Sequence, residues 1–329
     1  MRLDRVGVLG AGAFGTALAQ LAAARGRETL LWGRDPELAA AINRTHSNAK
    51  YLPGTALSPA LRATSNLRDL AECDCWLVVT PAQAMRSVLS AAPAGDRPLI
   101  LCSKGIEASS GKFASEIAGD VSPGATVGIL SGPGFADEIA SGLPTAVTFA
   151  TADAGLYDAF QQRLATPSLR LYHTNDVTGA QVGGAVKNVL AIACGVVEGK
   201  GLGQSARAAL IARGYAEMSR FAEAVGARRE TLAGLSGLGD LVLTCSSPAS
   251  RNFSLGVALG HRRAAGELVT NAEKLAEGAF TAPVLARLAR ERGVDMPIVD
   301  AVEGLLAGRF TVDQLLEQLL RRPPRPEAH

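Results

Sequence analysis

The sequence predicts an α/β fold in its first half and an all-helical fold in its second half. Short, continuously apolar stretches such as Arg5–Leu9, Trp76–Thr80 and Pro98–Cys102 suit the buried strands of a parallel sheet. From residue 176 onward the strand signals fade, and apolar residues recur with a helical period up to Leu320. We therefore predict two domains, residues 1–175 and residues 176–329, which suits a chain of 329 residues.

A glycine-rich turn follows the first strand directly. Its sequence is Gly10-Ala11-Gly12-Ala13-Phe14-Gly15, and a helix begins at Thr16. The spacing G-x-G-x-x-G between a strand and a helix is the fingerprint of a dinucleotide site. The first glycine permits the tight turn, the second lets a pyrophosphate approach the backbone, and the third lets helix and strand pack closely. Because the phosphates bind the free N–H groups of the helix N-terminus, this context predicts a doubly wound Rossmann domain. A glycine turn in another α/β fold is the weaker interpretation.

The end of the second strand bears on the choice of cofactor. The strand Thr29–Trp32 is followed by Gly33-Arg34-Asp35-Pro36. NAD sites usually place an acid at this strand end, whereas Asp35 before Pro36 resembles the cap of the next helix. A guanidinium such as that of Arg34 suits a 2′-phosphate, so we expect NADP or NAD to bind, with NADPH preferred. A surface arginine is the alternative.

Polar or glycine-rich motifs follow two further strands of the first half. Lys104 lies in Ser103-Lys104-Gly105-Ile106, and another turn has the sequence Gly132-Pro133-Gly134-Phe135-Ala136. Ligands of open α/β sheets bind beyond the carboxyl ends of the strands. We therefore expect Lys104 and the Gly132–Gly134 turn to face cofactor and substrate, with a plain capping role as the alternative.

The segment Gln181–Ala193 predicts a helix that is apolar or small nearly all round, with Lys187 and Asn188 in its middle. A buried lysine is rare and costly unless it is paired or faces a wet cavity. A lysine that extends its stem along a narrow solvent stripe is an equally good interpretation from the spacing alone. Glycines at positions 195, 199, 201 and 203 predict a break after this helix.

A second cluster of polar residues lies downstream. The stretch Gly234–Gly239 predicts a turn that delivers Asp240 to an apolar segment, where it could orient or ionise a lysine or serve as a helix cap. Arginine, asparagine and serine in Ser250-Arg251-Asn252 could bind a phosphate or carboxylate at a helix start. A capped helix with a surface arginine is the alternative. Leu275–Gly278 precedes another helix and could form a loop over the cofactor.

Composition excludes several classes of function. The net charge of +2 gives no electrostatic argument for nucleic acid or membrane binding, and the apolar runs are interrupted by Lys, Asn or Gly. The 5 cysteines are scattered, Cys73-x-Cys75 is too close for the usual zinc spacing, and the 4 histidines do not cluster. We expect reduced thiols, no metal, no nucleic acid, no membrane insertion and a cytoplasmic location.

Taken together, these motifs show that the sequence resembles the bacterial-type NAD(P)-dependent glycerol-3-phosphate dehydrogenases over nearly its whole length. The resemblance rests on motifs in both halves. They are Gly10–Ala17, Leu31–Arg34, Lys104–Ile106, Gly132–Ala136, Lys187–Ile192, Arg213–Met218, Gly237–Leu241 and Ser250–Asn252. The family interconverts dihydroxyacetone phosphate and sn-glycerol 3-phosphate for phospholipid synthesis. The resemblance implies a helical domain similar to the C-terminal domain of 6-phosphogluconate dehydrogenase, and it permits a homodimer.

The resemblance also assigns roles to individual residues. It implies that Lys187 is the catalytic lysine, with Asp240 beside it. The implied substrate contacts are Lys104, Gly132, Gly134, Lys187, Asp240, Ser250, Arg251 and Asn252. With the glycine fingerprint included, the implied cofactor contacts are Gly10, Gly12, Ala13, Phe14, Gly15, Arg34, Lys104, Ala136, Arg251, Leu275 and Glu277.

The sequence departs from the family pattern at two positions, and two other functions compete with the one implied. Gly134 stands where a hydroxyl-bearing residue is usual, and Ser205 stands where asparagine is common, which puts a local polar contact in doubt at each. A reductase of the 3-hydroxyacid or ketopantoate kind would share both halves and the lysine, but Arg251 and Asn252 imply a phosphorylated substrate. A regulator that senses NADP without catalysis would have no use for Lys187, Asp240 and Arg251 together.

Overall fold

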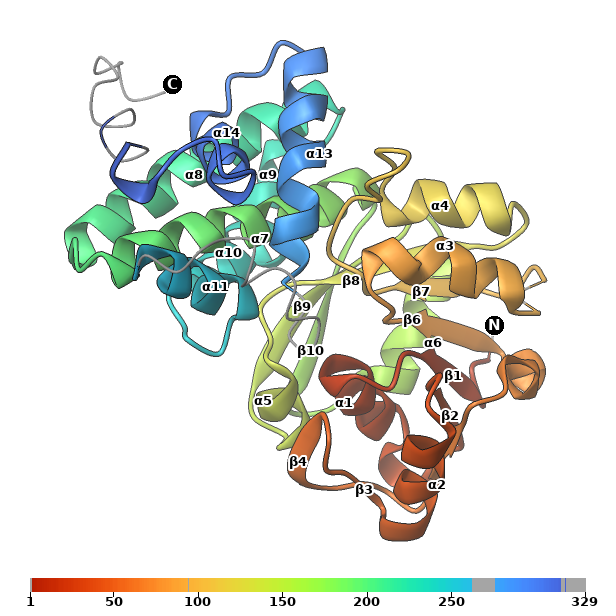
Figure 1. Cartoon of the computed structure of the whole chain (residues 1–329). Helices are drawn as coiled ribbons and strands as arrows, with labels where there is room; N and C mark the ends of the chain where they lie inside the picture. Colours follow the sequence, from red (N-terminus) through yellow and green to blue (C-terminus); the bar gives the residue numbers. More distant parts are fainter. Residues whose placement is uncertain (1, 94, 262–275, 315–316, 318–329) are drawn as a thin grey trace. The chain divides into compact units, whose positions relative to one another are not determined.

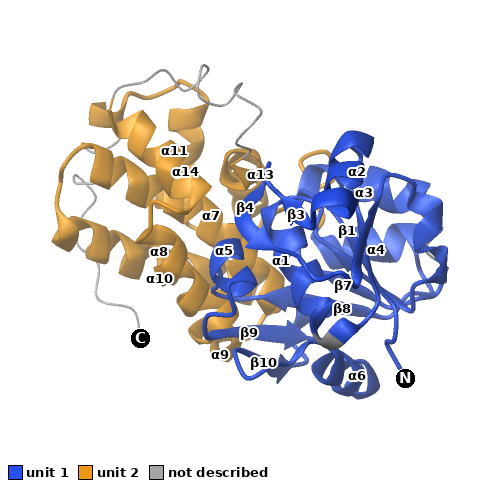
Figure 2. Cartoon of the chain, turned by 90° about the horizontal axis from the view of Figure 1, so that it is seen from below, with its two compact units in different colours: residues 1–103, 113–177 blue, residues 104–112, 178–329 orange. Residues whose placement is uncertain are grey.

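The computed structural model describes residues 2–93, 95–261, 276–314 and 317 (Figure 1). Their contacts form two compact units (Figure 2). Unit 1 comprises Met1–Ser103 and Phe113–Val177, and unit 2 comprises Lys104–Lys112 and the described part of Thr178–His329. The segment Lys104–Lys112 thus groups with unit 2 although unit 1 flanks it on both sides. The division that we predict between residues 175 and 176 stays a prediction.

Unit 1 is built on an eight-stranded sheet with the order β10-β9-β8-β7-β6-β1-β2-β5. The strands of this sheet are β1 (Val6–Leu9), β2 (Thr29–Trp32), β5 (Leu61–Thr64), β6 (Cys75–Val78), β7 (Leu99–Leu101), β8 (Val127–Ser131), β9 (Thr145–Ala150) and β10 (Leu169–Thr174). β1 pairs in parallel with both β2 and β6, so the strand order reverses around it. β9 pairs antiparallel with β8, and β10 pairs in parallel with β9, so these two strands run opposite to the other six. The predicted parallel sheet is confirmed, with this one reversal added.

Helices and a small hairpin complete unit 1. Their bounds are α1 (Ala13–Ala22), η1 (Ala24–Gly26), α2 (Pro36–Thr45), β3 (Ser47–Asn48), β4 (Leu52–Ala56), η2 (Leu67–Glu72), α3 (Ala82–Ala91), α4 (Ala114–Val121), α5 (Ala136–Ala140) and α6 (Ala154–Leu164). α3 packs against α4, while α1 contacts α5 and α6. One apolar cluster joins Leu18 of α1 and Phe160 of α6 to Val8 of β1 and Phe149 of β9. This core fixes α1, and with it the glycine turn that precedes α1.

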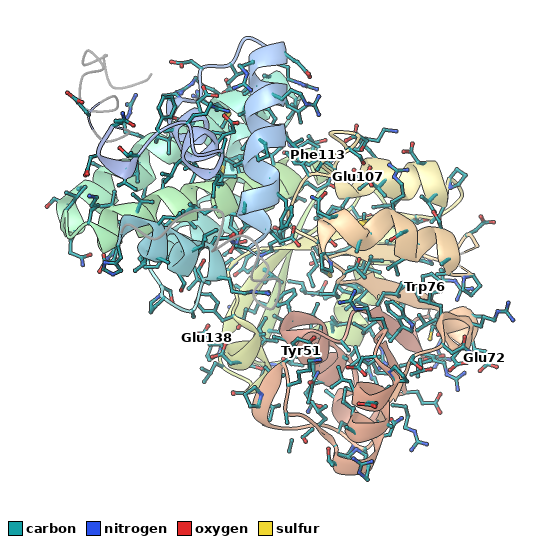
Figure 3. All side chains as sticks on the ribbon, in the orientation of Figure 1. Tyr51, Glu72, Trp76, Glu107, Phe113 and Glu138 are labelled. Atoms are coloured by element: carbon teal, nitrogen blue, oxygen red, sulfur yellow. The ribbon has the colours of Figure 1, made fainter. Side chains whose placement is uncertain are left out.

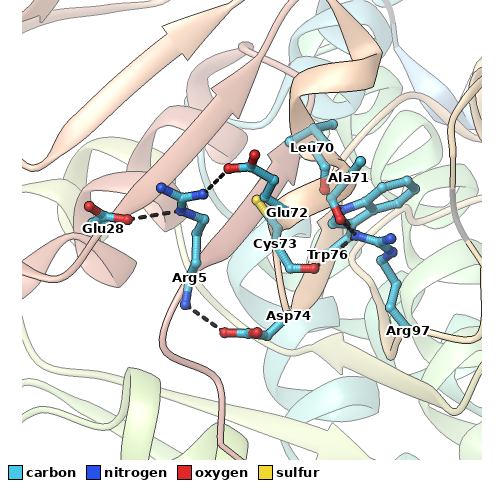
Figure 4. A network of polar contacts seen from close by, with 9 residues as sticks. All are labelled: Arg5, Glu28, Leu70, Ala71, Glu72, Cys73, Asp74, Trp76 and Arg97. Atoms are coloured by element: carbon cyan, nitrogen blue, oxygen red, sulfur yellow. Dashed lines mark hydrogen bonds and ion pairs between the residues drawn. The ribbon is translucent and has the colours of Figure 1, made fainter.

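Charged side chains connect the amino ends of several strands, which is the end of the sheet opposite the glycine turn. Figure 4 shows these contacts. The backbone N–H of Arg5 donates to the carboxylate of Asp74 at 2.7 Å, and its guanidinium pairs with Glu28 at 2.8 Å. The guanidinium of Arg97 lies 4.7 Å from the ring centre of Trp76 and donates to three backbone carbonyls in and just after η2. These contacts stabilise the sheet at the amino ends of its strands.

Unit 2 is helical, as predicted. Its elements are α7 (Val177–Gly199), α8 (Gln204–Ala224), α9 (Arg229–Ala233), η3 (Leu235–Gly239), α10 (Asp240–Cys245), α11 (Arg251–Gly260), α13 (Glu277–Glu291) and α14 (Pro297–Leu306). α7 is long and apolar enough to cross a membrane by length and composition. However, 94% of its most apolar window is buried, as in the central helix of a helical domain.

The predicted break after this helix is confirmed, because α7 ends at Gly199 and α8 begins at Gln204, but Gly195 is not part of the break and lies within α7. A Cβ atom on Gly195 would lie 2.0 Å from the carbonyl oxygen of Phe253, and one on Gly256 would lie 2.0 Å from that of Ile192. Gly195 therefore allows α7 and α11 to cross in backbone contact. Such a contact between helices far apart in the sequence leaves no local signal that distinguishes it from a helix end.

Candidate active site

The glycine turn of unit 1 contains one glycine that its own fold does not require. Gly10 has a φ of +122°, which favours glycine, and a Cβ on Gly15 would lie 1.8 Å from the carbonyl oxygen of Gly10. Gly12 has an ordinary φ of −74°, and a Cβ there would meet nothing within 4 Å. Open space above Gly12 is what a pyrophosphate lying on the backbone needs, so the residues present fit a dinucleotide.

The N-terminus of α1 lies beside this open space. Gly12 is its N-cap, and no side chain caps the helix. The first N–H groups of a helix have no partners within the helix, and the helix dipole makes this end attractive to phosphate. Ala13, Phe14 and Gly15 stand in this first turn, where the sequence places cofactor contacts; those contacts stay predictions.

Of the two charged side chains that follow β2, one caps a helix and the other is exposed to solvent. Asp35 is the N-cap of α2, and its carboxylate accepts from the backbone N–H groups of Glu37 and Leu38, each at 3.1 Å. The hydrogen bond from Leu38 is the main cause that lowers the pKa of Asp35, with Lys50 adding to it. Arg34 is exposed. The capping role that we predict for Asp35 is confirmed, which leaves Arg34 as the side chain available to a ligand.

The turn after β8 holds the other predicted contacts of unit 1. Gly132 has a φ of +138°. At Gly134, where the family usually carries a hydroxyl-bearing residue, space for a side chain is tight, because a Cβ there would lie 3.0 Å from the side chain of Ile139. Ala136 begins α5. Their contacts with substrate and cofactor stay predictions.

Unit 2 brings two lysines to one carboxylate. The Nζ of Lys187 donates to Oδ1 of Asp240 at 2.7 Å and to Oγ1 of Thr244 at 2.7 Å. The Nζ of Lys104 donates to Oδ2 of Asp240 at 2.6 Å. Lys187 is 7% exposed and Asp240 is 1% exposed, so the ion pair is buried. The buried, paired interpretation of Lys187 is therefore correct, and the solvent-stripe interpretation is wrong.

The electrostatics of this cluster set the charge of Lys187. Burial lowers the pKa of Lys187 to about 8, the negative charge of Asp240 opposes this shift, and the positive charge of Lys104 reinforces it. For Asp240, burial acts to raise the pKa, but the charges of Lys104 and Lys187 outweigh it and the net pKa is lowered. Lys187 can consequently exchange a proton near neutral pH while Asp240 remains a carboxylate.

Close backbone packing positions the pair. A Cβ on Gly183 of α7 would lie 2.2 Å from the carbonyl oxygen of Ser236 in η3. A Cβ on Gly237 would lie 2.0 Å from the carbonyl oxygen of Leu232. η3 is a π-helical turn, a rare conformation that is frequent at functional sites. Because Lys187 follows Gly183 by one helical turn and Asp240 begins the helix after η3, this approach brings the two side chains together.

Two asparagines connect the cluster to neighbouring elements. The amide nitrogen of Asn188 donates to the carbonyl oxygen of Lys104 at 2.9 Å. The amide nitrogen of Asn252 donates to Oδ1 of Asn188 at 2.9 Å, and Oδ1 of Asn252 accepts from the N–H of Gly278 at 2.9 Å. Asn252, which the sequence assigns to substrate, thus also holds α7, α11 and α13 together. Its contact with substrate stays a prediction.

The remaining predicted residues lie at two helix starts. Ser250 is the N-cap of α11 and accepts from the N–H of Phe253 at 3.2 Å, so its capping interpretation is confirmed. Arg251 follows it and is exposed. Glu277 is the first residue of α13. Leu275 lies outside the described residues.

Sequence reasoning missed Thr244 and the structural part played by Asn188. Thr244 lies four residues after Asp240 on the same helix, so both side chains reach the same face. Its spacing from Asp240 was the available signal. Asn188 is 5% exposed, and a buried amide must find partners. Its position beside Lys187 on an apolar helix could have indicated this.

Among the described residues, no group of three or more His, Cys, Asp or Glu side chains could hold a metal ion. Reversible hydride transfer needs a nicotinamide site and an amine or other group that can exchange a proton with the substrate oxygen. An open phosphate turn and a lysine with a pKa of about 8 supply these two requirements, which define a nicotinamide-dependent dehydrogenase.

Comparison with known proteins specifies the family. The family model for the N-terminus of NAD-dependent glycerol-3-phosphate dehydrogenase matches residues 5–156, and the model for its C-terminus matches residues 176–317. The chain belongs to the NAD-dependent glycerol-3-phosphate dehydrogenase family. The family, the enzyme class and the use of NAD or NADP that the sequence predicts are confirmed.

Relatives of known name cover nearly the whole chain. Glycerol-3-phosphate dehydrogenase, NAD(P)+, of Erythrobacter litoralis is 55% identical over 98% of this chain and 97% of its own length. The protein of the same name from Caulobacter vibrioides is 53% identical over 100% of both chains. The crystal structure of glycerol-3-phosphate dehydrogenase from Coxiella burnetii is 33% identical, covers 98% of this chain and 99% of its own, and superposes with a TM-score of 0.92. A D-mandelate dehydrogenase is only 15% identical, with a TM-score of 0.63, and shares the fold alone.

Proposed function

We propose that this chain reduces dihydroxyacetone phosphate to sn-glycerol 3-phosphate with Lys187 as the general acid. The observation that carries the proposal is the buried cluster in which Lys187 shares the carboxylate of Asp240 with Lys104. A bound nicotinamide cofactor supplies the hydride that reduces C2 of the ketone. Lys187 gives a proton to the C2 oxygen and becomes a neutral amine, which solvent then reprotonates. In the reverse direction the neutral amine of Lys187 removes the hydroxyl proton.

The neighbours of Lys187 keep its amine oriented and able to titrate. Asp240 and Thr244 accept hydrogen bonds from Nζ of Lys187, whose ammonium has three N–H groups, so the third N–H can point at a substrate oxygen. The ammonium of Lys104 places a second positive charge beside the same carboxylate, where it would stabilise negative charge that develops on the substrate oxygen.

We assign the phosphate of the substrate to Arg251. It is exposed at the start of α11, where a guanidinium and the positive end of the helix dipole both favour an anion. Oxidation of NADPH, followed by absorbance, should depend on dihydroxyacetone phosphate. Arg251→Ala should raise the KM for this substrate roughly ten- to a hundredfold, the loss expected for one charge-assisted contact. Turnover of unphosphorylated dihydroxyacetone serves as the control; an equal loss with both substrates would remove Arg251 as the phosphate contact.

For the cofactor, we propose that NADPH is used at least as well as NADH. The support is that the carboxylate of Asp35 is committed to capping α2, while the guanidinium of Arg34 is exposed just after β2. Arg34→Ala should lower kcat/KM for NADPH by about tenfold or more and leave NADH within about twofold, because a guanidinium donates paired hydrogen bonds to a phosphate. Asp35→Ala is the matched variant: if it alone changes the preference, and against NADH, then Asp35 binds the ribose.

A part in phospholipid synthesis, a cytoplasmic location, a homodimer and the lack of nucleic-acid or membrane partners stay predictions.

A further inference from the structure

A buried asparagine of unit 1 contacts the glycine turn from a distant part of the sequence. Asn48 is 0% exposed and lies in β3, after α2. Its amide nitrogen donates to the carbonyl oxygen of Ala11 at 3.0 Å and to Oγ1 of Thr16 at 2.8 Å. Its Oδ1 accepts from the backbone N–H of Tyr51 at 3.2 Å. Both ends of this amide are therefore used, one on the glycine turn and one on its own hairpin.

These bonds fix the peptide group at the centre of the turn. A trans peptide is planar, so its carbonyl and the following N–H point in opposite directions. With the Ala11 carbonyl held against Asn48, the N–H of Gly12 points away from Asn48. Thr16 adds to the restraint, because its N–H donates to the carbonyl oxygen of Gly12 at 2.9 Å while its hydroxyl receives Asn48.

The turn needs this external restraint. Glycine is the residue with the most backbone freedom, and the turn holds Gly10 and Gly12 on either side of Ala11. No side chain caps α1 at Gly12. A turn that changed shape would have to be ordered again when a dinucleotide binds, which weakens binding.

We propose that Asn48 is a positioning residue for the cofactor pyrophosphate. It holds the Ala11 carbonyl inward, so that the backbone N–H groups around Gly12 are preset for the phosphates. Asn48 is held in place by the hairpin of β3 and β4. Tyr51 lies at the turn of this hairpin (Figure 3), and its backbone N–H donates to Oδ1 of Asn48. Because the pyrophosphate is common to NADP and NAD, Asn48 serves both cofactors equally, unlike Arg34.

The test measures binding to the purified enzyme by titration calorimetry, with NADPH, NADH and ADP-ribose as probes. Asn48→Ala should raise the Kd of all three by a similar factor, about five- to a hundredfold, the change that corresponds to one or two lost buried hydrogen bonds. At saturating NADPH, kcat and the KM for dihydroxyacetone phosphate should stay within about threefold, because Asn48 touches only the turn in this scheme.

Asn43 provides a matched control. Its amide makes two hydrogen bonds of 2.8 Å, with the carbonyl oxygen and the N–H of Ala63, and so links α2 to β5 within unit 1. Asn43→Ala should lower the melting temperature about as much as Asn48→Ala while leaving all three Kd values within about twofold. An equal loss of affinity in the two variants would reduce Asn48 to a general structural role and overturn the proposal.

Thr16→Val keeps the test decisive if Asn48→Ala does not fold. Valine preserves the shape of threonine but cannot receive the amide of Asn48, so the affinity for all three ligands should fall about two- to tenfold. The proposal would also be overturned if every variant of this pair that folds bound all three ligands with unchanged affinity. A loss of affinity for NADPH alone would overturn it as well.

Discussion

Asp240 and Glu217 are both buried carboxylic acids of the helical unit, yet their surroundings give them opposite properties. Asp240 is 1% exposed and accepts hydrogen bonds from two lysines and lies 3.3 Å from the hydroxyl of Thr244. Glu217 is 2% exposed and accepts from the backbone N–H groups of Ile298 and Val299, at 2.9 to 3.3 Å. Burial raises the pKa of Glu217 to about 8, whereas the lysine charges keep the pKa of Asp240 below its usual value.

The contrast shows that burial alone does not decide the charge of an acid. Desolvation is the largest influence on both groups and acts in the same direction, and it is outweighed only where cations lie within hydrogen-bond distance. Glu217 instead satisfies N–H groups at the start of α14, which a helix leaves without partners. Asp240 is thus part of a charged cluster suited to proton transfer, and Glu217 is a structural link between α8 and α14.

Removing the lysine that Asp240 orients should have the largest effect. Lys187→Ala should fold and bind NADPH but lose roughly two to four decades of turnover, the contribution of a general acid. Steady-state kinetics at saturating substrates measures the loss, and in the wild type the rate of ketone reduction should fall as pH rises through about 8. A variant that kept a tenth of wild-type turnover would contradict the assignment of Lys187.

Neutral analogues of the two acids should separate their roles. Asp240→Asn removes the charge that supports the ammonium form of Lys187, so turnover at pH 7.5 should fall about three- to twenty-five-fold, the loss of protonated amine when the pKa of Lys187 drops by about one to two units from about 8. Glu217→Gln mimics a carboxylic acid that is already protonated at this pH and should leave turnover within about twofold. Equal effects of the two substitutions would show that the distinction between these acids is wrong.

The pH dependence of stability should carry the signature of Glu217. Its pKa in the folded state is about 8, above its value of 4.5 in the unfolded chain, so the folded state binds the proton more tightly. The stabilisation is fully present below pH 4.5 and is lost as pH rises through about 8, with a slope of at most about 1.4 kcal/mol per pH unit.

Urea unfolding of wild type and Glu217→Gln at pH 5, 6.5 and 8 measures this slope. As pH rises, the free energy of unfolding of the wild type should fall relative to that of Glu217→Gln. Other titrating groups are the same in both proteins and cancel in the comparison. A difference that is constant across this range would mean that Glu217 keeps an ordinary pKa.

The sequence by itself determined the features that depend on neighbours along the chain. A strand, three glycines and a helix in direct succession specify the phosphate turn, and the pair Asp35-Pro36 specifies the start of α2. Lys187 in an apolar helix could be recognised as unusual for the same reason. These signals are local, because turn geometry and capping involve residues only a few positions apart.

Only the tertiary structure decided which distant groups meet. It showed that Gly195 lies in a helix crossing and not at a helix end, that Thr244 completes the hydrogen bonds of Lys187, and that Lys104 groups with the helical unit. It also paired Asn48 with Ala11, 37 residues away. The physical reason is that a buried polar group must find a partner, but many partners would satisfy the same group, and only the packing of the whole fold selects one.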